Sequence, residues 1–242
     1  MISKNKKERV LCIIPARGGS KGLINKNIKK ICKKPLIYFP IAAALKSNVC
    51  DEIFVSTDSK KIADIAKSYG ANVPFLRKKK YAKDLTSTEE TLKNALIEYE
   101  DFYKKKFDIC VFLTANRIFR KSQWITTVVN NLKRDKKIDS SFAVHKLYTH
   151  FWTKKKNKYQ KALPWMKDYT SRQVAPEFYR EDTSLACASR SFLWRKGKRI
   201  GKNIKFLIHD DPFSGIDIHS EEDLYLASKA MEYRLKKEGK FF

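Results

Sequence analysis

The sequence lacks any apolar run long enough to cross a lipid bilayer, and the apolar stretch at 10–14 is too short for a signal-peptide core. We therefore expect a cytoplasmic protein with no membrane partner. Paired cysteines are missing too: none of the five belongs to a C-x-x-C pair, and no histidine cluster accompanies them. Because zinc sites and disulfide frameworks need such groupings, the spacing argues against both.

Acidic residues are also scarce: 26 Asp and Glu stand against 52 Lys and Arg, which gives a formal net charge of +26. Such an excess fits a nucleic-acid partner, and it equally fits a lysine-biased surface. We favour the second interpretation and expect no nucleic-acid partner, because lysines occur throughout the chain and no arginine-rich arm is present. A positive field would also attract anionic substrates.

What the first half does contain is an alternation of short buried strands and helices. We expect strands at 9–14, 52–56, 73–76 and 107–113, and helices at 36–46, 59–69, 87–103 and 123–133. This order predicts an α/β fold in which helices cover both faces of a mostly parallel sheet, making three layers. Ligands of such sheets bind beyond the carboxyl ends of the strands.

The second half is less regular. We expect strands at 140–144, 185–194 and 205–208 and a final helix at 220–237, whereas 145–167 is aromatic and basic without periodicity. The chain has no internal repeat and no flexible linker. We therefore predict a single domain over 1–242 with a small irregular insertion at approximately 141–169.

A glycine-rich stretch directly follows the first strand. It reads Pro-Ala-Arg-Gly-Gly-Ser-Lys-Gly from Pro15 to Gly22, and Lys26 and Asn27 come shortly after. Three glycines permit positive φ and a close approach of backbone N–H groups to a ligand, while Arg17 and Lys21 add the positive charge that a triphosphate requires. The spacing matches neither the Walker A nor the G-x-G-x-x-G pattern. The alternative is a glycine-rich surface turn.

This stretch resembles the signature of acylneuraminate cytidylyltransferases, the CMP-sialic acid synthetases and their relatives for legionaminic and pseudaminic acids. The resemblance implies a Rossmann-like nucleotidyltransferase fold. It also implies transfer of CMP from CTP to the anomeric hydroxyl of a nine-carbon acidic sugar, with release of pyrophosphate. In the family the loop holds CTP, and the corresponding nucleotide-binding residues here are Ala16, Arg17, Gly18, Gly19, Ser20, Lys21 and Asn27. Arg17 and Lys21 would act in catalysis.

Further segments extend the resemblance. Arg77 matches an arginine near the nucleotide, and Ser87 matches a serine that contacts it, although a surface arginine and a helix N-cap are the alternatives. The residues expected to bind the acidic sugar are Arg172, Gln173, Arg180 and Asn116. Arginine suits a carboxylate because its guanidinium pairs in a bidentate manner. Ser171 and Asp182 stand where relatives usually have Arg and Asn.

The segment Ile216-Asp217-Ile218-His219 resembles a family segment in which two aspartates hold a divalent metal. We expect Asp217 and His219 to bind Mg²⁺, or Mn²⁺ in its place, with Asp217 also counted as catalytic. Histidine is a poorer Mg²⁺ ligand than the aspartate it replaces.

The largest departure is Leu-Thr-Ala-Asn-Arg-Ile-Phe-Arg at 113–120, where relatives usually carry Leu-Gln-Pro-Thr-Ser-Pro-Leu-Arg. It leaves the acceptor open between a sialic-acid-like sugar and a Kdo-like sugar acid. A catalytically impaired nucleotide- or nucleic-acid-binding protein is the third alternative. The resemblance also implies a homodimer, with the aromatic insertion at the interface.

Overall fold

The centre of the fold is the strand β1 (Val10–Pro15), in which residues 10–14 are completely buried. Val10, Cys12 and Ile14 pack into one hydrophobic cluster, whereas Leu11 and Ile13 pack into another on the opposite face of the sheet. A strand that is apolar on both faces must be covered on both sides. The computed structural model describes residues 7–20, 22–83, 85–163, 173, 176–239 and 241.

The main sheet has seven strands. Six follow the order β11-β6-β10-β5-β1-β4, and the seventh, β9, pairs with β6. Their bounds, beyond β1, are β4 (Glu52–Ser56), β5 (Ile109–Phe112), β6 (Ser140–Leu147), β9 (Phe178–Glu181), β10 (Cys187–Arg190) and β11 (Ile204–His209). β1 is parallel to β4 and β5, and β11 is parallel to β6, whereas β10 and β9 run antiparallel to their neighbours. The prediction of a mostly parallel sheet is confirmed.

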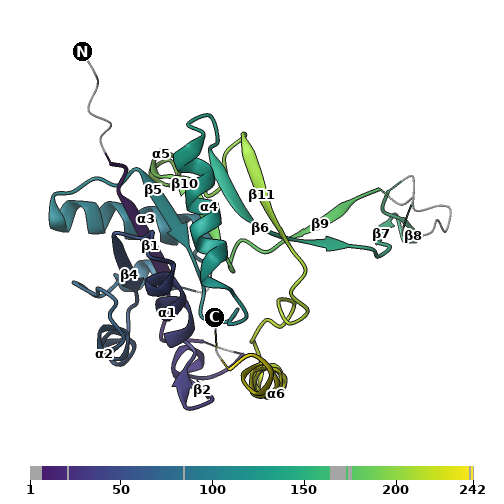
Figure 1. Ribbon diagram of the computed structural model, residues 1–242, viewed down its shortest axis with the longest axis horizontal. Helices are drawn as coiled ribbons and strands as arrows, with labels where there is room; N and C mark the ends of the chain where they lie inside the picture. Colours follow the sequence, from purple (N-terminus) through teal and green to yellow (C-terminus); the bar gives the residue numbers. More distant parts are fainter. Residues whose placement is uncertain are drawn as a thin grey trace.

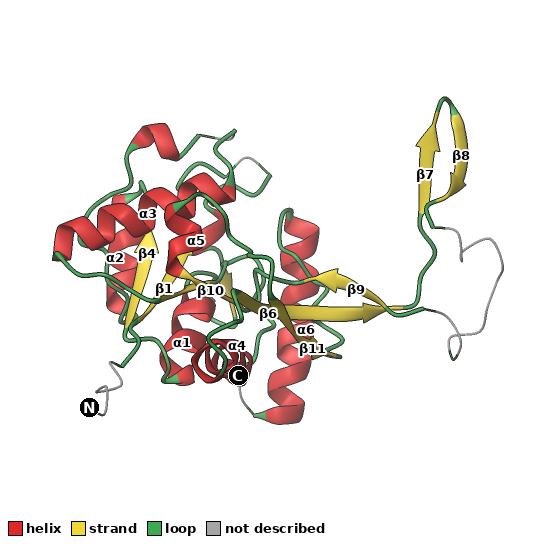
Figure 2. Cartoon of the chain, turned by 90° about the horizontal axis from the view of Figure 1, so that it is seen from above, coloured by secondary structure: helices red, strands yellow, loops and turns green. Residues whose placement is uncertain are grey.

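Helices cover both faces of this sheet (Figures 1 and 2). One cluster includes residues of α1 (Tyr38–Ser47), α2 (Lys60–Ser68), α4 (Ser122–Arg134) and α6 (Glu221–Glu238), and the other includes residues of α3 (Thr88–Tyr103) and α5 (Ser191–Arg195). Short elements complete the fold: the 3₁₀ helices η1 (Lys26–Ile28) and η2 (Lys79–Tyr81), and the strands β2 (Lys30–Ile31) and β3 (Lys34–Pro35). In the part of the chain that the structure describes, no helix has the length and apolarity needed to cross a bilayer.

One expected strand is absent, and another is shorter than expected. Residues 73–76 form no strand, and pairing stops at a single bridge between Phe54 and Asn72. Pro74 has no N–H to donate to a ladder, which explains why the strand does not continue. The expected strand at 185–194 is a strand only over β10. α5 starts at Ser191, whose hydroxyl donates to the Phe107 carbonyl (2.6 Å) and turns the chain.

An arm projects from the body of the molecule (Figures 1 and 2). It consists of the far end of β6, the strand β9, and a hairpin of β7 (Trp152–Lys155) and β8 (Lys158–Lys161). Lys156 and Asn157 both have positive φ in the hairpin turn, as a two-residue type I′ connection requires. The predicted insertion at 141–169 therefore starts inside β6, whose first residues are buried in the sheet; residues 164–169 lie outside the described part.

Candidate functional site

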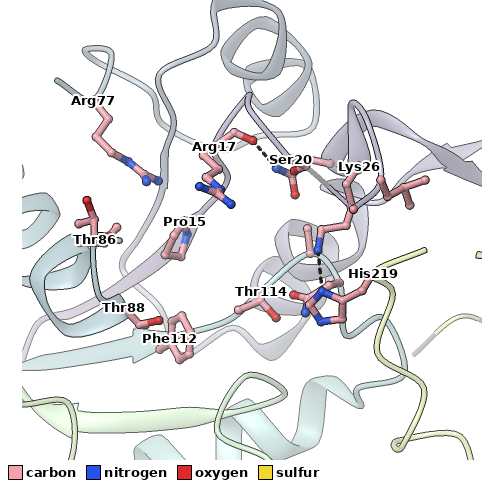
Figure 3. Close-up of a pocket in the computed structure, with 16 residues that line it drawn as sticks. Pro15, Arg17, Ser20, Lys26, Arg77, Thr86, Thr88, Phe112, Thr114 and His219 are labelled. Atoms are coloured by element: carbon pink, nitrogen blue, oxygen red, sulfur yellow. Dashed lines mark hydrogen bonds between the residues drawn. The ribbon is translucent and has the colours of Figure 1, made fainter. Parts of the chain in front are cut away.

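A pocket of about 360 Å³ opens where β1 and β5 end (Figure 3). Its walls come from five segments: the loop after β1, the segment between α2 and η2 that carries Arg77, the start of α3, the loop after β5 and the segment before α6. Parallel strands bring their carboxyl ends to one edge of a sheet, and loops that lie far apart in sequence meet there. The pocket is thus at the edge where the sequence predicted a ligand.

Three hydrogen bonds fix the glycine-rich loop. The Ala16 N–H donates to the Ser56 carbonyl (2.9 Å), and the Gly18 N–H donates to Asp58 Oδ1 (2.8 Å). The amide of Asn27 donates to the Arg17 carbonyl (2.8 Å), which ties the end of the loop to its beginning. The loop is therefore held in place by the chain itself.

Of the predicted nucleotide-binding residues on this loop, Arg17, Ser20 and Asn27 line the pocket. Gly18 and Gly19 belong to the loop without lining the pocket. Lys21 lies outside the described residues.

The loop glycines do not use the positive φ that glycine permits: none of Gly18, Gly19 and Gly22 has one. What requires glycine is a close approach at one position: a Cβ on Gly22 would lie 2.7 Å from the carbonyl oxygen of His219. Gly22 therefore allows the loop after β1 to touch the segment before α6.

Arg77 lines the pocket, but most of its donors are used within the protein. Its Nε donates to Ser56 Oγ (3.0 Å), its Nη2 donates to the Ser56 carbonyl, and its Nη1 donates to the Tyr81 carbonyl (3.5 Å). Burial lowers the pKa of Arg77 to about 10; Asp58 opposes this shift and Arg17 adds to it. Arg77 thus contributes a fixed charge to the wall and also anchors the loop after β4.

Ser87 is the N-cap of α3, where its hydroxyl accepts from the Glu90 N–H (3.1 Å), and it does not line the pocket. Its neighbours Thr86 and Thr88 do. The geometry agrees with the capping alternative, and the nucleotide contact stays a prediction.

Lys26 is a site residue that the sequence reasoning did not select. It lines the pocket, and its Nζ lies 3.5 Å from Nδ1 of His219 (Figure 3). Burial lowers the pKa of Lys26, Asp217 raises it and Arg17 lowers it. The available signal was its position directly before Asn27 in the same motif.

The structure places Asp217 and His219, the expected metal ligands, next to Asn116, which was expected to bind the sugar. Asp217 Oδ1 accepts from the amide of Asn116 and lies 3.0 Å from Nε2 of His219. Among the described residues no group of three His, Cys, Asp or Glu side chains forms a complete metal site. Mg²⁺ commonly binds one or two carboxylates and takes its other oxygens from water and substrate phosphates. The half-exposed Asp217 fits that arrangement.

Arg180 does not line the pocket. Its guanidinium forms a bidentate pair with the buried carboxylate of Asp182 (Nε to Oδ1 3.0 Å, Nη2 to Oδ2 2.8 Å). Burial raises the pKa of Asp182, but hydrogen bonds from His209, Arg180 and Arg117 outweigh it, so the pKa lies well below its usual range. Gln173 is exposed, and Arg172 lies outside the described residues.

The sequence pattern of the family described as Cytidylyltransferase matches residues 11–230. The chain is 32% identical over 233 residues to "Post-translational flagellin modification protein B" of Campylobacter coli, covering 95% of this chain and 96% of that protein. It is 33% identical over 217 residues to the CMP-N,N'-diacetyllegionaminic acid synthase of Campylobacter jejuni subsp. jejuni serotype O:2, covering 88% and 91%.

A solved structure of a CMP:2-keto-3-deoxy-manno-octonic acid synthetase complexed with CTP has the same fold. Its TM-score is 0.68 at 15% identity, with 94% of this chain and 100% of that chain covered.

Proposed function

The chain belongs to the cytidylyltransferase family, and we propose that it transfers CMP from CTP to the anomeric hydroxyl of a nonulosonic acid, a nine-carbon acidic sugar, with release of pyrophosphate. The observation that carries this proposal is the pocket beyond β1 and β5. Its walls bring Arg17, Lys26 and Arg77 around a loop whose backbone is already fixed.

In the proposed reaction the anomeric oxygen attacks the α-phosphorus of CTP. The new bond joins this oxygen to phosphorus, and the bond from phosphorus to the bridging oxygen of pyrophosphate breaks. Negative charge grows on the leaving pyrophosphate, so cations placed beforehand lower the barrier. We assign this role to Arg17 and Lys21, with Lys26 as a third cation. Ser20 and Asn27 would orient the phosphates.

A divalent cation, Mg²⁺ or Mn²⁺, would be held by Asp217, with His219 beside it. When bound, it would neutralise phosphate charge. The half-exposed carboxylate of Asp217, which contacts the pocket-lining residues Asn116 and His219, supports the assignment.

A nonulosonic acid is favoured as acceptor because the full-length relative named a legionaminic acid synthase is 33% identical. The Kdo-like alternative, left open by the departure at 113–120, gains no support from the solved synthetase structure, because its 15% identity supports the fold alone. Asn116 is the predicted sugar-binding residue that lines the pocket. Arg180 would reach an acidic sugar only with the donor that Asp182 leaves free, its Nη1.

The test is pyrophosphate release from CTP with Mg²⁺ and a panel of N-acetylneuraminic, legionaminic, pseudaminic and Kdo acceptors. We expect turnover with one nine-carbon acceptor. Arg17→Ala and Lys21→Ala should each lower it by about 100-fold or more, since each removes a charge that stabilises the transition state. Arg134→Ala, at the exposed end of α4, should not. Turnover only with Kdo, or none with any acceptor in Mg²⁺ or Mn²⁺, would refute the proposal.

We also propose that the chain forms a homodimer through its arm. Exposed aromatic side chains gather there, with Tyr148, Phe151, Trp152 and Tyr159 each at least 41% exposed. Aromatic residues are enriched at protein interfaces. Light scattering should give twice the chain mass for the unaltered protein and the chain mass for Trp152→Ser with Tyr159→Ser. A monomeric unaltered protein would refute this assignment.

We place the protein in the cytoplasm. All five cysteines are unpaired thiols, and three of them are buried in the core, as suits a reducing compartment.

A further inference from the structure

The carboxylate of Asp217 already has protein partners on both oxygens. Oδ1 accepts a hydrogen bond from Asn116 and lies near His219, while Oδ2 lies 3.6 Å from Nη1 of Arg117. Arg117 carries a full positive charge, so it partly neutralises the carboxylate of Asp217, which lies beside the pocket-lining residues Asn116 and His219.

Arg117 cannot easily move away. Its side chain is only 10% exposed, and its Nη2 donates to Asp182 Oδ1 (2.7 Å) and to the Ser214 carbonyl (2.6 Å). Asp182 is itself buried and held by Arg180 and His209. A guanidinium held by these bonds keeps its positive charge in one position.

Lys26 is a second cation near Asp217, and Asp223 is a further carboxylate beside Lys26. Lys26 lies close enough for Asp217 to raise its pKa and for Arg17 to lower it. No group of three potential metal ligands occurs among the described residues. A divalent cation that approached Asp217 in the free protein would meet a carboxylate shared with Arg117, a second carboxylate, Asp223, that already accepts two backbone N–H groups, and the positive charges of Arg117 and Lys26. A triphosphate would reverse this balance, because it brings oxygen ligands and negative charge of its own.

We propose that Arg117 is a positioning residue that acts as the internal counter-ion of Asp217, so that the free protein does not retain a divalent cation and the cation enters together with the triphosphate. The inference rests on the proposed function, because it takes CTP as the triphosphate. It assigns a role to an arginine that belongs to the largest departure from the family sequence.

The first experiment measures Mn²⁺ binding to the free protein by electron paramagnetic resonance, without nucleotide or sugar. Unaltered protein should bind weakly. Arg117→Gln should bind Mn²⁺ about five- to tenfold more tightly, because a unit charge about 4 Å away is worth about 1 kcal/mol even in a water-like dielectric. A merely structural role for Arg117 would instead leave Mn²⁺ affinity unchanged or weaken it.

Three further variants make the result specific. Arg117→Lys keeps the charge and should bind as weakly as the unaltered protein. Asp217→Asn added to Arg117→Gln should abolish the gain. Arg195→Gln removes an equal charge from an ion pair with Glu100, beside Phe107 at the opposite edge of the sheet, and should change nothing.

The second experiment measures the affinity of unaltered protein for CTP by calorimetry. Mn²⁺ should strengthen CTP binding to the unaltered protein and should do so much less in Asp217→Asn. Thermal unfolding monitors folding of every variant. If Arg117→Gln does not fold, Arg117→Gln with Asp182→Asn replaces it, because removing both partners leaves no unpaired buried charge between them.

Tight Mn²⁺ binding to unaltered protein without CTP, or an unchanged Mn²⁺ affinity in a folded Arg117→Gln, would overturn the inference. A separate measurement, the acceptor assay, would refute the proposed function. If no sugar acid accepts CMP, the function is refuted, while the Mn²⁺ measurements still decide the role of Arg117.

Discussion

Replacing Gly22 by alanine tests how the loop after β1 meets the segment before α6. A Cβ at this position would lie 2.7 Å from the carbonyl oxygen of His219. A carbon and an oxygen atom need about 3.3 Å, so one backbone must retreat by roughly 0.5–1 Å. Since the obstacle is backbone, no side-chain rotation relieves it. A displacement of about 1 Å at a reacting centre costs up to about 100-fold in rate.

We therefore expect Gly22→Ala to lower kcat/KM for CTP by about 10- to 100-fold, with about 1–3 kcal/mol lost in the free energy of unfolding. The control is Arg134→Ala, at the exposed end of α4. Steady-state kinetics and urea unfolding measure the two quantities. Equal kinetics for the two variants would refute the argument that contact between the segments shapes the site.

Three other changes test the frame around the pocket. Arg120→Met should lower the free energy of unfolding, measured in urea, by about 3–5 kcal/mol, because the fully buried guanidinium donates to three backbone carbonyls. A loss no larger than that of the exposed Arg134→Met would contradict this. Burial raises the pKa of Glu100, but hydrogen bonds from Arg195, the Phe107 N–H and Lys106 lower it overall. The ionised Glu100 therefore stabilises the folded protein fully above the unfolded pKa of about 4.3, and this stabilisation is lost as the pH falls below that value. Glu100→Gln should thus lower the melting temperature by a constant amount from pH 5 to 8 and by less below about pH 4, unlike the exposed Asp101→Asn; a difference that grew in acid would be contrary to this. Ser220→Ala should cost about 1 kcal/mol in urea unfolding, because Ser220 forms a capping box at the start of α6, and no loss would show that the cap is not needed there.

Much of the fold could be predicted because its signals are local. β1 is apolar at successive positions, and α2 is preceded by the N-cap Ser59, whose hydroxyl accepts from the Ile62 N–H. The strand expected at 73–76 failed for an equally local reason, since Pro74 lies in its middle. The start of α5 could not be read in this way, because Ser191 turns the chain by bonding to Phe107, a residue far away in sequence.

Residues that line the pocket could be named from sequence where a motif carries them, and not where contacts between segments carry them. Arg17, Ser20, Asn27 and Asn116 line the pocket, while their contacts with CTP and the sugar stay predictions. Arg180 could not be placed from sequence, because its partner Asp182 decides where its guanidinium points.

The departures from the family pattern also gain meaning only in three dimensions. Arg117 stands where relatives usually have Ser, and Asp182 stands where they usually have Asn; both are buried, and losing one of them would remove an ion-pair partner from the other, which is destabilising. The two residues are 65 positions apart, yet they form a direct ion pair of 2.7 Å. The same Arg117 also reaches Asp217, which Asn116 and His219, two further departures, contact as well. Substitutions that look independent along the chain therefore form one connected charge network at the rim of the pocket, and a change of metal or sugar preference in this protein should be sought there first.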